Sequence, residues 1–342
     1  MTRGRLKFLF RLVVSIALIG FLLRRVNWQE LQGVGSQLQP LWFLPILLGM
    51  FITSTLSSWK WSMFLKADGI HIPLPRLTAS YMISTFFSCF LPSSIGGDVY
   101  RVMVVGKSAG TSKAMAAVAM GRLTGFFTLA AIGLIAALIS RETIGDPRVV
   151  WSIAGVLAFV VVSFLLVCSR RCMSLGSWLA NLVKLGKVAR VAQGVQDSIL
   201  RYRSKPSVIL GALAVSVLQQ LTVVLSISLL ARALTIDAGF VYFLCFIPVI
   251  EAIATLPISI FGVGVRDSLY VLYFGTVGIS EAQCLSMSLL YVTVTLLYSS
   301  LGGLLYLSRQ GEIRSRSQQG EESPAEPPES TAAEIEETHS NC

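Results

Sequence analysis

Two stretches of this chain decide its fold: Leu91-Pro92-Ser93-Ser94-Ile95-Gly96-Gly97-Asp98-Val99-Tyr100-Arg101 and Leu256-Pro257-Ile258-Ser259-Ile260-Phe261-Gly262-Val263-Gly264-Val265-Arg266. Aligned without a gap, they agree in the Leu, the Pro, one Ser, one Ile, one Gly and the final Arg. A second match, 110–114 with 278–282, follows at nearly the same distance and leads each time into a long apolar segment. Two linked matches in the same order indicate an internal repeat.

Both stretches combine residues that interrupt a helix. A Pro cannot continue a helix without the loss of a backbone hydrogen bond, and Gly permits tight turns and close backbone contacts. We therefore predict a break after a first helical arm, followed by a second short helix. The predicted hinge residues are Pro92, Gly96, Gly97, Pro257, Gly262 and Gly264.

The composition places these breaks in a membrane. The 342 residues are 54% hydrophobic and only 13% charged, with a mean hydropathy of +0.70, whereas soluble proteins carry about 25% charged residues. This excludes a soluble enzyme. The net charge of +10 resides mostly in short loops between apolar segments, so a nucleic-acid-binding face is also excluded.

The apolar segments define an all-α polytopic membrane protein. Six of them are long enough to span, or nearly span, a bilayer: residues 8–23, 41–58, 114–139, 149–167, 208–230 and 282–307. Two more, 77–91 and 240–256, run into the Pro and Gly residues and are followed by arms too short to span. We interpret these two as re-entrant hairpins, which gives eight apolar segments in total.

Loop charges predict the orientation. With both hairpins returning to the side they enter from, most Lys and Arg fall on one side, so both termini are expected in the cytoplasm. The first hairpin then enters from inside and the second from outside. The repeat halves, about 77–140 and 240–307, would thus be inverted relative to each other, as in many secondary transporters.

Two regions lie outside this core. Residues 170–205 combine a helical apolar repeat with basic residues, which favours an amphipathic helix on the cytoplasmic surface; a solvated connector is the alternative. Residues 309–342 are rich in Ser, Glu and Pro, and we predict a disordered acidic cytoplasmic tail after a membrane domain at 1–308.

Charged residues at membrane depth are the candidate substrate-binding residues, because such groups are costly there and usually face a pathway or a partner. The alternatives are that Asp98 caps its helix, that each Arg snorkels or pairs with a carboxylate, and that Arg122 pairs with Glu251. The Cys and His spacing indicates no metal site, and we predict no cofactor. The candidates are Asp98, Arg101, Arg122, Glu251, Arg266 and Asp267.

The motifs resemble those of the lysylphosphatidylglycerol synthase transmembrane family, the flippase-like module of bacterial peptide-resistance factors. They are Leu-Pro-x-x-Ile-Gly-Gly-Asp-x-x-Arg at 91–101, Gly-Arg-Leu at 121–123, the run at 257–267 and Gly-Gly-Leu-Leu-Tyr at 302–306. The resemblance implies functional roles for Asp98, Arg101 and Arg266. It also implies a bacterial or archaeal plasma-membrane protein that handles an anionic or polyprenyl-linked lipid.

Two departures from the family pattern affect the site. Asp267 replaces a frequent Glu, and Gly121 replaces a frequent acid, so Arg122 needs another partner. We expect a stand-alone membrane module without the family's soluble aminoacyl-transferase domain.

Three functions are compatible with these features. The first is a lipid translocator without catalytic residues, in which the two halves rock around a central cavity. The second is a membrane enzyme that transfers a sugar or headgroup on a lipid carrier, with Asp98, Glu251 or Asp267 as base or metal ligand. The third is an accessory subunit of a separate synthase or transferase. The sequence favours the translocator, with membrane lipids as its partners.

Overall fold

The computed structural model describes residues 39–90, 95–139, 194–195, 197–202, 204–255 and 262–321, with isolated residues between 151 and 162. Within these ranges the chain is helical and contains no strand. The chain divides into two compact units, residues 1–303 and 304–342. All of the following contacts lie within the first unit.

Four helices are long and apolar enough to cross a membrane. They are α3 (Phe43–Ala67, entered through the short helix η1, Pro40–Trp42), α6 (Thr111–Ile139), α11 (Pro206–Ala233) and α14 (Glu281–Glu321). They confirm four of the six predicted spans. The predicted span 8–23, and most of 149–167, lie outside the described residues.

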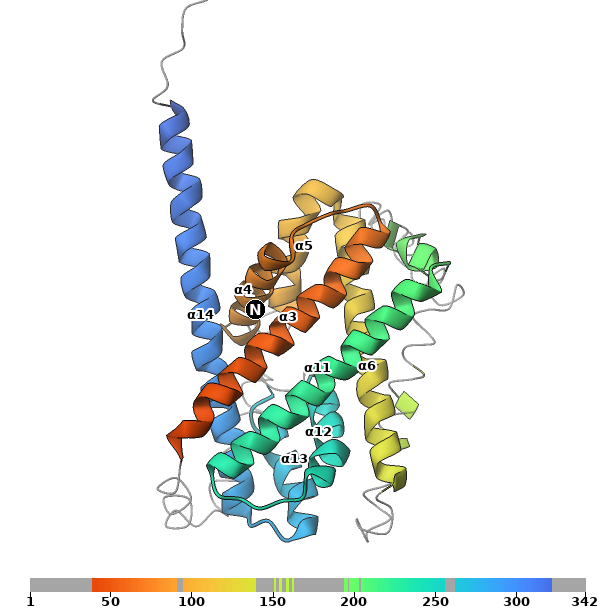
Figure 1. The fold of residues 1–342 in the computed structure, drawn as a ribbon, viewed down its shortest axis with the longest axis vertical. Helices are drawn as coiled ribbons and strands as arrows, with labels where there is room; N and C mark the ends of the chain where they lie inside the picture. The colour runs from red at the N-terminus through yellow and green to blue at the C-terminus, as the bar shows by residue number, and fades with distance from the viewer. Residues whose placement is uncertain are drawn as a thin grey trace, which may run out of the picture. The chain divides into compact units, whose positions relative to one another are not determined.

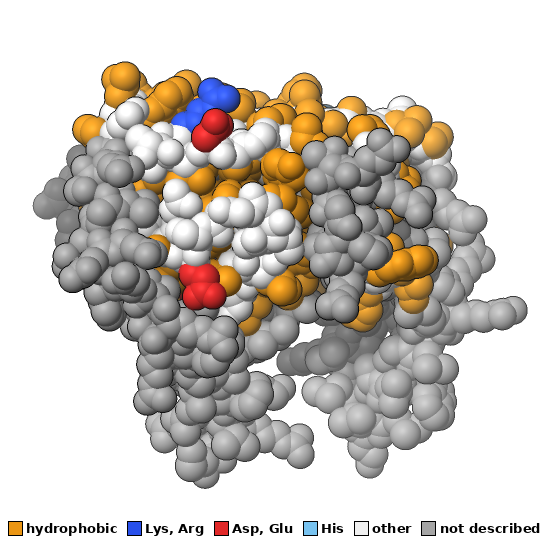
Figure 2. All heavy atoms as spheres, turned by 90° about the horizontal axis from the view of Figure 1, so that it is seen from below, with side chains coloured by type: hydrophobic (Ala, Val, Ile, Leu, Met, Phe, Trp, Pro, Cys, Tyr) orange, Lys and Arg blue, Asp and Glu red, His pale blue; other side chains and the backbone are white. Residues whose placement is uncertain are grey.

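The outer faces of these helices are apolar. Leu41 and Leu44 before and in α3, Leu210 in α11 and Ile139 in α6 are all largely exposed. Figure 2 looks from below at one end of the bundle, where hydrophobic and uncharged side chains surround a few charged ones. Exposed apolar surface of this extent on long helices is what lipid tails would cover, so the bundle is that of a multi-pass membrane protein.

Helices α3 and α11 run antiparallel and pack along their length (Figure 1). At one end, the Gln39 amide N–H donates to the Ala233 carbonyl oxygen at 2.9 Å. Further along, the Lys60 Nζ lies 3.0 Å from the Ser216 Oγ. Other helices pack against this pair: α6 contacts both α3 and α11, and α12 contacts α11.

The first broken segment forms two antiparallel arms, α4 (Leu74–Phe90) and α5 (Ile95–Ala109). The rings of Phe87 and Tyr100 have centroids 5.2 Å apart, and the Arg101 guanidinium lies 4.9 Å from the centroid of the Tyr81 ring. Later residues of α5 thus face earlier residues of α4. The residues between the two arms, 91–94, contain the predicted break and lie outside the described residues.

The second broken segment repeats this arrangement with α12 (Phe240–Ala254) and α13 (Val265–Phe274), followed by the short helix η2 (Gly275–Val277). The Glu251 carboxylate contacts Arg266 near the break, and the rings of Phe246 and Phe274 lie 5.3 Å apart at the open end. The arms are antiparallel here too. The residues between them, 255–264, contain the second Pro and Gly run, of which 256–261 lie outside the described residues.

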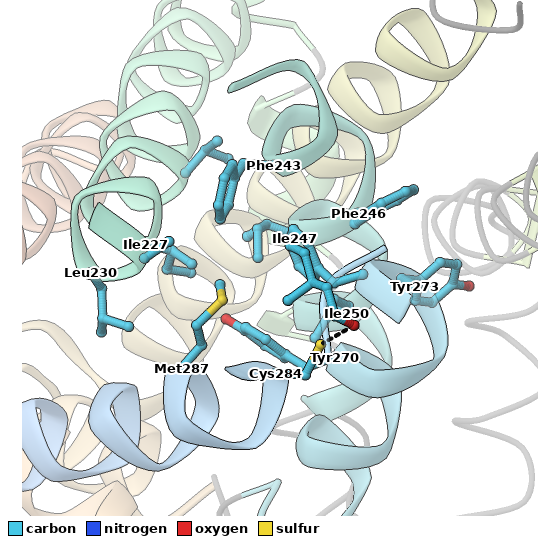
Figure 3. Close-up of a cluster of buried hydrophobic side chains, with 14 of the residues drawn as sticks. Ile227, Leu230, Phe243, Phe246, Ile247, Ile250, Tyr270, Tyr273, Cys284 and Met287 are labelled. Carbon is cyan, nitrogen blue, oxygen red and sulfur yellow. Dashed lines mark hydrogen bonds between the residues drawn. The ribbon is translucent and has the colours of Figure 1, made fainter. Parts of the chain in front are cut away.

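The buried apolar side chains form two clusters at different levels of the long helices. One contains Leu65 of α3, Ala117 of α6 and Ala212 of α11, together with Leu77 and Val105 from the open end of α4–α5. The other contains Ile46, Ala130 and Leu230 of the same three helices. It also includes Phe243, Tyr273, Cys284 and Met287, and Figure 3 shows how α11–α14 meet there. The open ends of the two hairpins therefore lie at opposite levels, and their breaks point towards the middle of the bundle.

The cytoplasmic segment predicted at 170–205 lies mostly outside the described residues. Its end, 197–202, packs beside the C-terminus of α3. The Tyr202 hydroxyl donates to the Asp68 Oδ2 at 2.6 Å, and Arg201 pairs with the same carboxylate at 3.1 Å. Burial, then the hydrogen bond to Asp68, raise the pKa of Tyr202, so this hydroxyl stays protonated and remains a donor.

The C-terminal region differs from the sequence-based prediction of disorder from residue 309. Helix α14 continues to Glu321. Residues 309–321 contain Gln, Glu and Arg, which favour helix, and extension of an existing helix avoids the cost of nucleation. The rest of the predicted tail, 322–342, lies outside the described residues.

Candidate functional site

A charged cavity of about 380 Å³ lies between the two hairpin breaks. Its walls come from α3, α4, α5, α6, α11, α12 and α14. The charged side chains that line it are Lys60, Asp98, Arg101, Arg122 and Glu251. The fold thus brings four of the six predicted binding residues into one cavity.

Asp98 is the centre of the first ion cluster. It lies in the first turn of α5, where the helix dipole favours a carboxylate. Its Oδ2 pairs with the Nε of Arg122 from α6, and its Oδ1 lies 3.5 Å from the Nη1 of Arg101. The residue before Arg122 is Gly121 rather than an acid, and Asp98 supplies the carboxylate partner of Arg122 instead.

Arg101 is held mainly by aromatic rings. Its guanidinium lies 4.4 Å from the centroid of the Trp61 ring and 4.9 Å from that of Tyr81. The residue is only 7% exposed, and its Nε has no hydrogen-bond partner among the described residues. Aromatic faces stabilise a cation but use none of its N–H donors. Arg101 thus keeps hydrogen-bonding capacity for another group.

The second hairpin carries the other ion pair. The Glu251 Oε1 on α12 lies 3.3 Å from the Arg266 Nε on α13. The Arg266 guanidinium also lies 4.8 Å from the centroid of the Tyr291 ring. Arg266 is 6% exposed, and it meets the cavity through Glu251 and Tyr291, which both line the wall.

Asp267 has a different environment from the other candidates. It accepts a hydrogen bond from the Gly264 amide at 2.8 Å and another from the Ser288 hydroxyl, and it is almost fully buried. It therefore caps the start of α13 and ties that helix to α14. It is not among the described residues that line the cavity.

The hinge residues differ in what the structure requires of them. Gly262 and Gly264 have positive φ angles of 75° and 85°, which favour glycine. A Cβ on Gly97 would lie 2.2 Å from the backbone oxygen of Ser84, so this glycine allows the two arms to touch. Gly96 lies in the first turn of α5. Pro92 and Pro257 are outside the described residues.

Lys60 is the cavity residue that the sequence interpretation missed. The predicted span 41–58 ends two residues before it, but α3 continues to Ala67 and leaves Lys60 only 5% exposed. Its Nζ donates to the Ser216 Oγ at 3.0 Å and to the Gln219 Oε1 at 2.9 Å. One signal for this was Ser57, three residues earlier and thus on the same helical face.

A second, smaller cavity of about 210 Å³ adjoins the first. It lies among α3, α4, α11 and α14, and its wall includes Met50, Tyr298 and several Ser and Thr residues but no charged side chain. Four residues line both cavities: Tyr81, Thr85, Val223 and Tyr291. A charged space therefore continues into an uncharged one.

This geometry can be compared with known proteins. Residues 8–303 match the family described as the lysylphosphatidylglycerol synthase TM region. The chain belongs to this family. The match covers both hairpins and every charged residue of the cavity. Membership of this family implies a membrane protein of lipid metabolism or transport. The chain matches no curated protein.

Proposed function

We propose that this protein translocates an anionic or polyprenyl-linked lipid across the plasma membrane of a bacterium or archaeon. The observation that carries the proposal is the charged cavity between two broken hairpins in a bundle with an apolar exterior. In hydrocarbon, irregular backbone is tolerated only where protein or a wet cavity receives its polar groups. Passage of a lipid headgroup would account for a polar cavity at that depth.

The adjoining cavities support an amphiphile rather than a small ion. The charged cavity suits a headgroup, whereas the uncharged one, with Met50 and Val223 in its wall, suits the start of a hydrocarbon chain. Tyr81 and Tyr291 line both spaces, and a phenol ring has an apolar face beside a polar hydroxyl. The two spaces together match a molecule with one polar and one apolar part.

The helix lengths support the re-entrant interpretation of the hairpins. The longest arm, α4, has 17 residues, which corresponds to about 26 Å at about 1.5 Å per residue. The arms α5, α12 and α13 have 15, 15 and 10 residues and are shorter still. A bilayer core is about 30 Å thick. Each hairpin therefore returns to the side it entered from, and the two halves form an inverted repeat.

Alternating access then needs only a small motion. Residues next to the breaks line the cavity, Ser88 and Asp98 in the first hairpin and Thr255 in the second, and each hairpin packs into its own cluster of apolar side chains. Rocking of one half against the other would open the cavity to one side and then to the other.

A proteoliposome assay tests this function. The purified protein is incorporated into phosphatidylcholine vesicles that contain acyl-labelled fluorescent lipids, and impermeant dithionite quenches the label exposed outside. Translocation moves inner-leaflet lipid outwards and increases the quenched fraction. We expect faster exchange than in protein-free vesicles, and loss of that gain in Asp98→Asn, which unbalances Arg101 and Arg122. Equal rates with and without protein, across phosphatidylglycerol and polyprenyl phosphate, would exclude the function.

A further inference from the structure

Lys60 is a buried amine whose hydrogen-bond partners among the described residues are all neutral. Its ammonium group donates to Ser216 and Gln219, at 3.0 and 2.9 Å, and pairs with no described carboxylate. In contrast, Arg122 and Arg266 each form an ion pair with an acid. A buried charge is costly unless it is paired. The position of Lys60 is therefore favourable mainly when an anion occupies the cavity.

The surrounding charges lead to the same conclusion. The cations in and around the cavity are Lys60, Arg101, Arg122 and Arg266, and the carboxylates are Asp98, Glu251 and Asp267. With Lys60 protonated, four positive charges against three negative ones leave one excess positive charge. Because Glu251 and Asp267 are bound within the second hairpin, the excess falls on the side of α3, α5 and α6.

Arg101 provides a second, independent indication of a ligand. It lines the cavity, it is more than nine-tenths buried, and its Nε lacks a hydrogen-bond partner among the described residues. Its ring partner Trp61 is one residue after Lys60 on α3. Two buried cations, one with only neutral partners and one with a spare donor, thus line the same wall.

We infer that Lys60 and Arg101 together bind the phosphate of the lipid headgroup, and that Lys60 makes the cavity select a net-anionic headgroup over a zwitterionic one. This inference rests on the proposed function and adds to it the chemical group recognised and the residue that recognises it. A phosphate offers several acceptor oxygens, so it can accept from the ammonium and the guanidinium at once. A phosphocholine group brings its own cation, which the excess positive charge would repel.

Direct binding tests this selectivity without any need for transport. The probes are dihexanoyl phosphatidylglycerol, with net charge minus one, and dihexanoyl phosphatidylcholine, with net charge zero, titrated into the detergent-purified full-length protein. The wild type should bind phosphatidylglycerol more tightly. Lys60→Gln should lose about tenfold or more of that affinity, as expected for a charge-assisted hydrogen bond. The affinity for phosphatidylcholine should change less, because loss of the phosphate contact is offset there by weaker repulsion of the choline cation. Lys60→Arg should retain the preference.

Gln219→Glu is the sharpest variant because it changes almost no volume. The new carboxylate would lie where the Gln219 Oε1 now accepts from Lys60 at 2.9 Å, and it would neutralise the lysine internally. The preference for phosphatidylglycerol should then disappear although Lys60 is still present. This variant also decides the matter if Lys60→Gln does not fold. Lys66→Gln is the matched control, since Lys66 is an exposed lysine on the same helix.

Three results would overturn the inference: a wild type without preference, an unchanged preference in Gln219→Glu, or an equal loss in Lys66→Gln. Its failure differs from failure of the proposed function. Translocation that proceeds without any dependence on Lys60 would sink the inference alone. Selective, Lys60-dependent binding in a protein that translocates no lipid would sink the proposed function alone.

Discussion

Individual arginines in this protein are stabilised in two ways. Arg101 lies against the rings of Trp61 and Tyr81, and Arg266 combines the Tyr291 ring with the Glu251 carboxylate. A guanidinium tolerates such sites because it is weakly hydrated and stacks on aromatic rings. At this scale, aromatic side chains allow cations to remain buried beside a cavity without being fully neutralised.

The Glu251–Arg266 pair gives a prediction about stability. Glu251→Gln removes the carboxylate that pairs with Arg266, which is only 6% exposed, and should lower the free energy of unfolding by up to about 3 kcal/mol. Adding Arg266→Gln should recover part of this loss. The measurement is thermal unfolding in detergent.

Arg201 supplies the control for that pair. Its own side chain is 47% accessible, and although the Asp68 carboxylate is only 2% accessible, that carboxylate also accepts from the Tyr202 hydroxyl. Arg201→Gln should therefore destabilise the protein less than Glu251→Gln. Equal effects of Glu251→Gln and Arg201→Gln on thermal unfolding would show that the Glu251–Arg266 pair contributes no more to stability than the Asp68–Arg201 pair.

Sequence reasoning selects residues well where a charge interrupts an apolar run. Asp98, Arg122 and Glu251 stand out in this way, and they line one cavity. Lys60 escapes notice because it lies near a span end, where a lysine normally snorkels to water. Its burial follows from the packing of α3 against α11 and α6, which no local pattern encodes.

Each hairpin is an element whose arms depend on glycine for close contact. A Cβ on Gly97 would lie 2.2 Å from both the Ser84 backbone oxygen and the Ser88 Oγ. Because one obstacle is backbone, the arms α4 and α5 must separate to admit a methyl group. At Gly97 and Ser84 the two arms are thus close enough for their backbones to touch.

Gly97→Ala should therefore destabilise the protein by about 1–3 kcal/mol, the usual cost of overpacking. Gly121→Ala is the matched control, because an added Cβ there meets nothing within 4 Å and alanine favours helix. Thermal unfolding of the two variants in the same detergent makes the comparison. Equal midpoints would contradict the close contact inferred at the hairpin tip.

The positions of the breaks can be predicted at the level of elements, whereas the end of the last helix cannot. Pro and Gly runs mark the breaks through intrinsic backbone limits. Helix α14 continues past residue 309 because the sequence there, although polar, contains few residues that stop a helix. Polarity predicts exposure to water better than it predicts loss of helix.

For the molecule as a whole, the arrangement of the hairpins predicts a membrane topology. In a variant without native cysteines, single cysteines are placed at exposed positions before and after each hairpin. His71→Cys and Lys113→Cys flank the first hairpin and should react with an impermeant maleimide from the cytoplasmic side. Asp237→Cys and Thr276→Cys flank the second and should react only from the other side. Labelling of His71→Cys and Lys113→Cys from opposite sides would show that the first hairpin crosses the membrane.

The central claim is that a lipid headgroup crosses the membrane through the cavity between the hairpins. Translocation in vesicles by Arg101→Ala, compared with Arg76→Ala at an exposed position outside the cavity, tests it most directly. We predict that Arg101→Ala falls to the rate of protein-free vesicles while Arg76→Ala keeps the wild-type rate. Wild-type translocation in Arg101→Ala, with the protein folded and incorporated to the same level, would contradict the account.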